Sequence, residues 1–356
     1  MRVSELDLLR FIAALAVVFF HYVAWFVVDQ PQLNTILEPV ETVTRFGYLG
    51  VPLFFMISGF VILASAMQRN SIDFVVSRIV RLYPVYWLSV SLTVAVLILW
   101  GSDSQIISFK QYIVNLSMLQ SYVGVTNLDG VYWTLAKEIQ FYACIFLLLS
   151  FGLLNSVRSW LSIWLLITLT FHLFKQPFFM GWFITPEYSP FFIAGVCFYM
   201  IRAEKHVGYF SAMALLALLL SCNSVFTLSE QFIPNIDGRD RWISVLIICF
   251  FYILFWLIAK KKMIIKSSPI LIALGVLTYP LYLIHNMVGK VFLSKLNLLI
   301  GPEMSIVFVV ILMLSISHLI SRYYETIFSY SLRVALTKII KKLPFINNTD
   351  REVKII

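Results

Sequence analysis

The feature that most constrains this chain is a series of apolar runs about 17–22 residues long, the length that lets an α-helix span the ~30 Å hydrocarbon core of a bilayer. Because every backbone polar group must be paired inside the bilayer, only helices or closed barrels can cross it. Barrel strands would give shorter segments whose side chains alternate at every second residue. The chain is therefore predicted to cross a membrane as α-helices.

Composition supports this prediction. Charged residues make up 13% of the 356 residues, against about 25% in a soluble domain, whose surface must be solvated. Hydrophobic residues make up 60%, too large a fraction to bury in one aqueous core. The expected fold class is an all-α polytopic membrane protein with about ten transmembrane helices. The spans are expected at 8–28, 47–67, 82–100, 131–151, 159–174, 188–203, 208–224, 242–259, 270–288 and 304–321.

Basic residues in the loops indicate the orientation of these spans. One set of loops contains Arg69, Arg78, Arg81, Arg158, Arg202, Lys205, Lys260, Lys261, Lys262 and Lys266. The opposite set contains Arg45, Lys110, Lys175, Arg239, Arg241, Lys290 and Lys295. Because loops rich in Lys and Arg stay in the cytoplasm, the first set and both termini are expected to be cytoplasmic. The net charge of +9 is thus assigned to membrane orientation, and no nucleic-acid partner is expected.

The end of the chain has a different pattern, in which apolar residues recur at helical spacing and basic residues take the other face. The apolar positions are Leu332, Ala335, Leu336, Ile339, Ile340 and Leu343, and the basic ones are Arg333, Lys338, Lys341 and Lys342. We expect a transmembrane domain over 1–325 and a basic amphipathic cytoplasmic tail over 326–356, suited to anionic headgroups of the inner leaflet.

Arg10 and His21 are ionisable residues inside the first expected span. Such groups cost free energy in hydrocarbon, so each is a candidate functional residue. Eleven residues of α-helix correspond to three turns plus ~20° and a rise of ~16 Å. The two side chains therefore share a face, with Arg10 at the cytoplasmic interface and His21 beyond the midplane. The alternative for either residue alone is a snorkelling arginine or a histidine that packs between helices.

Glu138 lies in the fourth expected span, at about the depth of His21. A carboxylate at that depth can pair with the imidazole, orient it and raise its basicity. Arg78 and Arg81, at positions i and i+3, place two guanidiniums on one helical face at the cytoplasmic level. The fixed fork of arginine suits phosphate, although ordinary positive-inside charge also explains this pair.

His285 is a second candidate proton acceptor, at the outer end of the ninth expected span and loosely aligned with Tyr282. It is equally well interpreted as a water-exposed interfacial histidine. No established metal-site, nucleotide-loop or nucleophile-elbow pattern occurs in a suitable context. The four cysteines all fall inside apolar spans, so neither a metal site nor a permanently bound cofactor is expected.

Two further polar residues are interpreted as structural. Ser58, beside Gly59, is expected to let helices approach closely. Glu325, just past the last span, is expected to be exposed or paired with Arg322.

These candidates support one reaction. Arg10, Arg78 and Arg81 at the cytoplasmic side could bind a phosphorylated, water-soluble donor. His21 lies ~16 Å deeper on the face of Arg10, a distance comparable to an extended pantetheine arm. It could remove a proton from an acceptor hydroxyl as that hydroxyl attacks the thioester of an acyl-CoA. Glu138 would stabilise the imidazolium, and a covalent acyl-histidine stays open as an alternative.

Five sequence blocks resemble the acyltransferase-3 family of integral-membrane O-acyltransferases, and they occur in the family's order along nearly the whole chain. They are 9–21 (LRFIAALAVVFFH), 50–60 (GVPLFFMISGF), 78–84 (RIVRLYP), Trp133-Thr134-Leu135 with Glu138 and Phe141-Tyr142, and 282–285 (YLIH). Singly each block is weak, but together they are specific. Trp133, Tyr282 and His285 are therefore kept as secondary site candidates.

The resemblance implies a ten-helix domain in the cell (inner) membrane that moves acetyl or another small acyl group from cytoplasmic acyl-CoA. The implied acceptor is a hydroxyl of a surface polysaccharide or a lipid-linked glycan. The functional residues of the family carry over to Arg10, His21, Arg78 and Arg81. Glu325 lacks the proline that often follows it in the family, which leaves its role open. Acetyl-CoA is thus expected as a donor substrate rather than as a bound cofactor.

The main alternative is a transporter that exports a sugar or a lipid-linked glycan, because intramembrane charges serve that role equally well. Transporters often contain internal repeats with interrupted helices at corresponding positions, and the sequence shows no such pair. A structural scaffold is the third interpretation.

Overall fold

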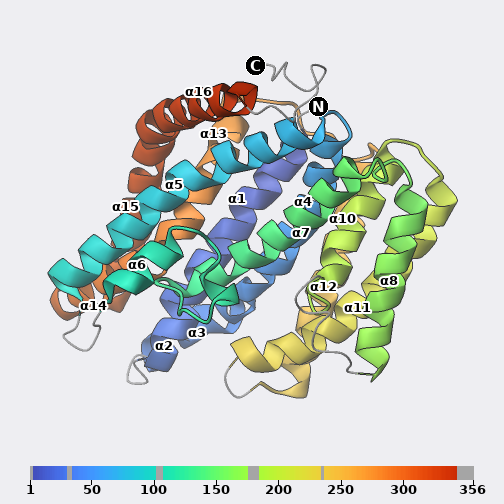
Figure 1. The fold of residues 1–356 in the computed structure, drawn as a ribbon. Helices are drawn as coiled ribbons and strands as arrows, with labels where there is room; N and C mark the ends of the chain where they lie inside the picture. The colour runs from blue at the N-terminus through green and yellow to red at the C-terminus, as the bar shows by residue number, and fades with distance from the viewer. Residues whose placement is uncertain (1–2, 30–33, 102–106, 175–183, 234–235, 343–356) are drawn as a thin grey trace. The chain divides into compact units, whose positions relative to one another are not determined.

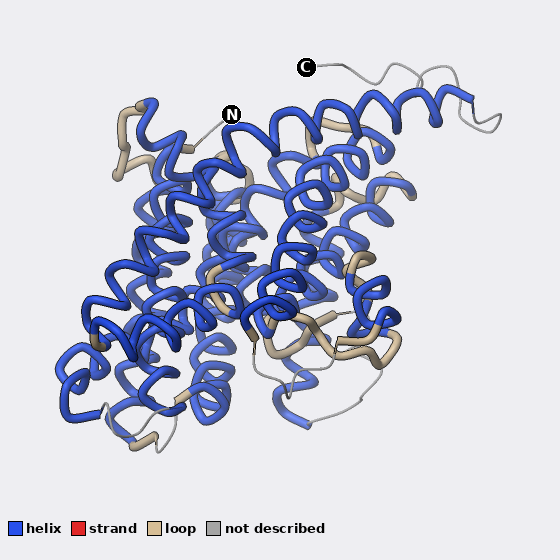
Figure 2. The backbone as a smooth tube through the Cα atoms, turned by 90° about the vertical axis from the view of Figure 1, so that its left-hand side faces the viewer, coloured by secondary structure: helices blue, strands red, loops and turns tan. Residues whose placement is uncertain are grey.

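The computed structural model describes residues 3–29, 34–101, 107–174, 184–233 and 236–342. Within these ranges the regular structure is helical and contains no strand (Figures 1 and 2). The predicted all-α fold class is therefore confirmed. The last part of the predicted tail, 343–356, lies outside the described residues.

Residue contacts divide the chain into two compact units. The first unit comprises Met1–Ala64, Lys137–Ile145 and Leu153–Gly275. The second unit comprises Ser65–Ala136, Phe146–Gly152 and Val276–Ile356. Three helices contribute residues to both units: α4 (Gly50–Ala66), α7 (Trp133–Ser150) and α13 (Pro269–Ile284).

The first unit begins with α1 (Ser4–Phe19), the π-helical segment η1 (Phe20–Ala24) and α2 (Trp25–Asp29), followed by α3 (Asn34–Thr44), the 3₁₀ segment η3 (Arg45–Leu49) and α4 (Gly50–Ala66). It continues with α8 (Val157–Phe174), α10 (Ser189–Arg202), α11 (Val207–Phe232) and α12 (Gly238–Ala259). Helix α10 is buried along almost its whole length and contacts α8, α11 and α12 (Figure 1). A helix that is apolar on all sides forms a core in this way.

The second unit contains α5 (Ser71–Trp100), α6 (Phe109–Asn115), the 3₁₀ segments η4 (Gln120–Tyr122) and η5 (Gly130–Tyr132), α14 (Met287–Ile300), α15 (Pro302–Leu319), the π-helical segment η6 (Ile320–Glu325) and α16 (Thr326–Lys342). The 30-residue α5 is its longest helix and contacts both α14 and α16. Helices α14 and α15 pack against each other.

Each of the ten expected spans falls on a helix. Among the described residues, seven helices are long and apolar enough to cross a membrane, or up to eight if α13 and α14, bent by 73° at their junction, form one span. Helix α10, with 14 residues, is shorter than a full crossing. The last expected span does not end at 321, because α15, η6 and α16 run together as one helical segment over Pro302–Ile340.

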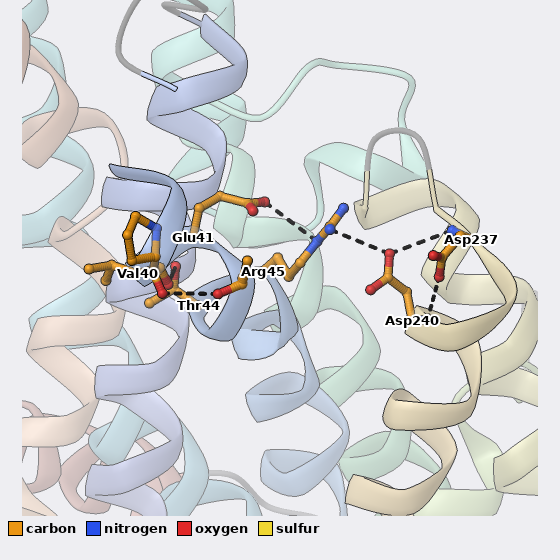
Figure 3. Close-up of polar contacts among 8 residues, drawn as sticks. Val40, Glu41, Thr44, Arg45, Asp237 and Asp240 are labelled. Atoms are coloured by element: carbon orange, nitrogen blue, oxygen red, sulfur yellow. Dashed lines mark hydrogen bonds and ion pairs between the residues drawn. The ribbon is translucent and has the colours of Figure 1, made fainter. Parts of the chain in front are cut away.

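Ion pairs join the start of α12 to α3 and η3 (Figure 3). Asp237 caps α12 by accepting a hydrogen bond from the backbone N–H of Asp240 at 2.8 Å. Arg45 lies between the carboxylates of Glu41 and Asp240, with N···O distances of 3.4 Å to each. Arg45 was expected to be a charge in a loop. It also makes a tertiary contact, because its guanidinium pairs with carboxylates on two helices.

Two glycines allow a close approach between α4 and α10. A Cβ added to Gly59 would lie 2.2 Å from the carbonyl oxygen of Phe192, and one added to Gly195 would lie 2.1 Å from that of Met56. Backbones approach this closely only where the side chain is absent. The expectation that helices approach closely at Ser58 and Gly59 is therefore confirmed at Gly59.

Gly59→Ala is expected to push α4 and α10 apart and to lower the thermal denaturation midpoint of the purified protein by ~5 °C. Gly208→Ala in α11 is the matched control, because a Cβ at that position meets no atom within 4 Å. Alanine also favours helix over glycine, so the control should unfold at or slightly above the wild-type temperature. Equal midpoints for the two variants would contradict the role of this contact.

Candidate functional site

His21 lies in a π-helical segment of the first membrane helix. The α-helix changes to a π-helix over Phe20–Ala24 and resumes at Trp25. π-helical segments are rare in proteins, and many of those that exist lie at functional sites. The extra residue in the turn changes the direction of the side chains. Residues 10–19 are regular α-helix, so only the last two residues of the expected ~16 Å rise from Arg10 to His21 fall in the π-helical segment.

A hydrogen bond to the backbone fixes which nitrogen of the His21 imidazole carries the hydrogen. Its Nδ1 lies 2.9 Å from the carbonyl oxygen of Val17, one turn earlier. A carbonyl oxygen only accepts, so Nδ1 carries the hydrogen and donates it. In the neutral ring the lone pair is then on Nε2. The ring of Phe20 packs edge-on at a centroid distance of 5.2 Å. Nε2 is therefore the nitrogen of His21 that can take a proton.

Glu138 is held by two hydroxyl groups. Its Oε1 accepts hydrogen bonds from Ser58 Oγ on α4, at 2.6 Å, and from the hydroxyl of Tyr142, one turn further along α7. Hydrogen bonds to a carboxylate are stronger than those between neutral groups. Ser58 therefore does more than the packing role predicted for it. The predicted pairing of Glu138 with His21 stays a prediction.

Arg10 forms an ion pair within its own helix. Its Nη1 lies 3.6 Å from Oδ1 of Asp7. The Asp7 side chain is buried against Gly275, where an added Cβ would lie 2.8 Å from the same oxygen. The nearby Glu5 is buried as well and accepts a hydrogen bond from the backbone N–H of Ile265 at 2.9 Å. The spacing of Asp7 and Arg10 signals such a pair, and the sequence interpretation missed it.

The two arginines of α5 differ in their surroundings. Arg78 Nε donates to Ser77 Oγ at 3.2 Å, and its guanidinium carbon lies 5.8 Å from the centre of the Phe74 ring. Arg81 Nη1 donates to Glu325 Oε1 at 2.5 Å. Arg78 thus contacts a hydroxyl and an aromatic ring of its own helix, and Arg81 pairs with a carboxylate distant in the chain.

The expectation for Glu325 was wrong. Its side chain is buried, with 9% of the residue exposed, and its partner is Arg81 rather than Arg322. Glu325 is the last residue of the π-helical segment η6, which contacts α5. The wider π turn shifts side chains relative to an α-helix, so a residue expected in water lies against α5.

His285 lies at a helix break. Helix α13 ends at Ile284, α14 begins at Met287, and the two are bent by 73°. The residue is 0% exposed, so the interpretation as a water-exposed histidine was wrong. The expected span over 270–288 is interrupted by this bend. Its Nδ1 donates to the carbonyl oxygen of Tyr282 at 2.8 Å, which leaves Nε2 as the basic nitrogen of the neutral ring.

Side chains from the start of α7 and from the loop before it pack at this break. The hydroxyls of Tyr282 and Thr134 are 2.9 Å apart. The buried carboxylate of Asp129 accepts hydrogen bonds from Asn286 Nδ2 at 2.7 Å and from the backbone N–H of Met287 at 2.8 Å. Burial raises the pKa of Asp129, and these hydrogen bonds oppose the shift. The sequence interpretation did not identify Asp129 as a candidate. Nothing in its local sequence indicates that it contacts the distant break between α13 and α14.

Of the secondary candidates, Tyr282 and His285 belong to this buried cluster of the second unit. Trp133 begins α7 and precedes Thr134, and its indole is partly exposed. Arg78 and Arg81 are also in the second unit, whereas His21, Arg10 and Glu138 are in the first.

Comparison with known proteins now decides the family. The model of the acyltransferase-3 family, described as an acyltransferase domain, matches residues 3–322. The chain belongs to this family. The resemblance drawn from the five sequence blocks is confirmed, and so is the enzyme class. The chain is an integral-membrane acyltransferase.

Two relatives are similar at low identity. Nodulation protein 10 of Rhizobium leguminosarum bv. viciae is 26% identical over 207 residues, which are 53% of this chain and 54% of that protein. The chain thus matches about half of the length of that relative. A protein of Acidianus two-tailed virus, ORF330, provisionally named as an acetyltransferase, is 25% identical over 304 residues, or 82% of this chain and 85% of that protein. No solved structure matches the chain.

Proposed function

We propose that this acyltransferase moves an acetyl or similar small acyl group from cytoplasmic acyl-CoA to a hydroxyl of a cell-surface glycan or a lipid-linked sugar. The observation that carries the proposal is the hydrogen bond from His21 Nδ1 to Val17, because it leaves Nε2 as a base inside the first membrane helix. The acetyltransferase name of the viral relative supports acetyl as the transferred group.

In the proposed reaction, Nε2 of His21 removes the proton of the acceptor hydroxyl as its oxygen attacks the thioester carbonyl. The C–O bond forms and a tetrahedral oxyanion results. When that intermediate collapses, the C–S bond breaks and the CoA thiolate leaves. The imidazolium then returns the proton to the thiolate, so the base is regenerated. His285, whose Nε2 is also the basic nitrogen of its neutral ring, is the alternative base.

Arginines bind the donor phosphates in this proposal. Arg10 lies ~16 Å along the helix from His21, about the length of an extended pantetheine arm, and the ion pair with Asp7 holds its guanidinium in place. Arg78 on α5 is a second donor-binding residue. Glu138 acts through His21 as a positioning residue that stabilises the imidazolium. The cytoplasmic location of the arginines is expected from the loop charges, and the cell (inner) membrane is the location that we propose.

The test uses membranes that contain the protein, acetyl-CoA labelled in the acetyl group, and surface glycan or lipid-linked precursor from a strain that lacks the gene. Label is expected in the glycan, and mass spectrometry should show the mass of one acetyl group added per repeat. Membranes without the protein are the control. Movement of glycan across the membrane without any acyl-CoA, and without labelling, would contradict the proposal and favour a transporter.

A further inference from the structure

The break between α13 and α14, in the second unit, is capped by a residue from a distant part of the chain. Asn286 is the N-cap residue of α14, yet its own side chain makes no capping hydrogen bond. Asp129 supplies the cap instead, because its Oδ2 accepts a hydrogen bond from the backbone N–H of Met287, the first residue of α14, at 2.8 Å. The side chain of Asn286 therefore makes a different contact.

That contact fixes the orientation of the Asn286 amide. Asp129 Oδ1 accepts a hydrogen bond from Asn286 Nδ2 at 2.7 Å and another from the backbone N–H of Val131 at 3.1 Å. Both oxygens of Asp129 thus accept from backbone N–H groups. An amide turned the other way would place its oxygen against an acceptor, so Nδ2 must face the carboxylate. Asn286 Oδ1 consequently points away from Asp129.

Asn286 Oδ1 is a buried acceptor to which no described group of the chain donates. The residue is 6% exposed, and among the described residues this oxygen has no hydrogen-bond partner. An amide oxygen can accept two hydrogen bonds, and leaving it unsatisfied in a buried place costs free energy. A ligand that donates a hydrogen bond would remove this cost.

Gly130 leaves the surface beside this amide without a side chain. Gly130 is exposed, and Asn286 Nδ2, at 3.4 Å, is the one described heavy atom within 4 Å of a Cβ added there, its chain neighbours apart. Gly130 begins the 3₁₀ segment η5, in which positions three residues apart lie in line. The partly exposed Trp133 is therefore on the same side of the chain. A few polar groups beside an aromatic ring are the usual lining of a small-molecule site.

The charges at the break suit an uncharged ligand. Asp129 is a buried anion, and the charge of Lys290 on α14 acts on it. A phosphate would meet this carboxylate, and a cation would meet a carboxylate that already accepts three hydrogen bonds. An amide oxygen accepts a hydrogen bond from a hydroxyl but is not basic enough to remove its proton. Asn286 can therefore orient a hydroxyl without activating it.

We propose that Asn286, Gly130 and Trp133 form a subsite for the sugar acceptor, in which Asn286 Oδ1 accepts a hydrogen bond from a hydroxyl other than the one that is acylated. Asp129 is a positioning residue that holds the amide. The identity of the acceptor rests on the proposed function, whereas the subsite rests on the contacts at the break. The loop charges predict that this end of α13 faces away from the cytoplasm, the side on which a surface glycan is expected.

The test measures acetyl transfer by the full-length protein in nanodiscs, with surface glycan from a strain that lacks the gene as the acceptor. Gly130→Ala adds one methyl group beside the amide of Asn286 at a distance of ordinary contact. It should raise the KM for the glycan by about tenfold, the size of one lost hydrogen bond, and leave the KM for acetyl-CoA unchanged. Gly238→Ala is the matched control, because Gly238 is also exposed and an added Cβ meets no described atom within 4 Å. It should change neither KM.

Asn286→Ala tests the amide itself and should raise the KM for the glycan by a similar factor. Because both changes remove the same hydrogen bond, the variant that carries both should be no weaker for the glycan than Asn286→Ala alone. Thermal denaturation shows whether the break still folds. If Asn286→Ala does not fold, Gly130→Ala decides, since its methyl group lies at the surface.

Each other outcome overturns an identified part. An unchanged KM for the glycan in Gly130→Ala refutes the subsite, and an increase confined to the KM for acetyl-CoA assigns the position to the donor. An increase that occurs only in nanodiscs with phosphatidylglycerol, and not with phosphatidylcholine alone, assigns it to the glycerol hydroxyls of a lipid headgroup. If wild type transfers no acetyl group to the glycan, the proposed function fails. Calorimetric titration of the same glycan into wild type and Gly130→Ala then decides the subsite, which equal affinities would refute.

Discussion

Replacing His21 with alanine is expected to lower the rate of acetyl transfer by about 10³-fold, within the range that general base catalysis contributes. The physical reason is that the hydrogen bond to Val17 orients the ring and leaves Nε2 as its basic nitrogen. The alanine variant removes the base but leaves the arginines that bind the donor phosphates. The KM for acetyl-CoA should therefore change little while kcat falls.

His318→Ala is the matched control, because His318 is an exposed histidine in the last turn of α15. It should retain wild-type activity. Thermal denaturation of both variants shows whether either one disturbs folding. Full activity in His21→Ala, together with complete loss in His285→Ala, would assign the base to His285 and refute the mechanism as written.

Glu138→Gln is expected to lower kcat by about 10²-fold, since the amide keeps the shape of the carboxylate but loses the charge that stabilises an imidazolium. The hydrogen bonds from Ser58 and Tyr142 position this carboxylate. Ser58→Ala and Tyr142→Phe should therefore each lower kcat by only about tenfold, because the charge remains. The KM for acetyl-CoA should stay near its wild-type value in all three variants.

A double-mutant cycle separates a role through His21 from a structural role. If Glu138 acts through the imidazole, the variant lacking both groups should be no slower than His21→Ala alone, because residues that act as a unit are not additive. Additive losses would show that Glu138 contributes independently. A pH–rate profile whose acidic limb moves in Glu138→Gln but not in Ser162→Ala, a partly exposed serine on α8, gives a second readout, because a general base loses activity when it is protonated.

Much of the candidate site could be predicted from the sequence, because charged groups are rare in membrane helices and stand out individually. Arg10, His21, Arg78, Arg81 and Glu138 were selected as candidates in this way, and their roles stay predictions. The partners that come from distant parts of the chain could not be predicted, because no local pattern indicates them. The hydrogen bond from Ser58 to Glu138 joins residues 80 positions apart, and the ion pair of Arg81 with Glu325 joins residues 244 positions apart.

The two interpretations that failed, for Glu325 and His285, have a common physical cause. Both assumed that a residue at the end of an apolar run projects into water. The π-helical segment before Thr326 and the bend after Ile284 change the direction of the chain at those points. Helical periodicity is uniform along a sequence, so a local change from an α-helix to a π-helix or to a bend is not visible in it.

By itself the sequence determined that the chain is an all-α membrane protein and that it belongs with the membrane acyltransferases, and it predicted that an arginine and a histidine share one face of its first helix. Hydrocarbon imposes the first result, because every backbone polar group must be paired within a span. Only the tertiary structure decided that Ser58 contacts Glu138, that Glu325 pairs with Arg81, and that Asp129 contacts the break between α13 and α14. Those results depend on packing between helices distant in the chain, where geometry within a few ångströms selects each partner.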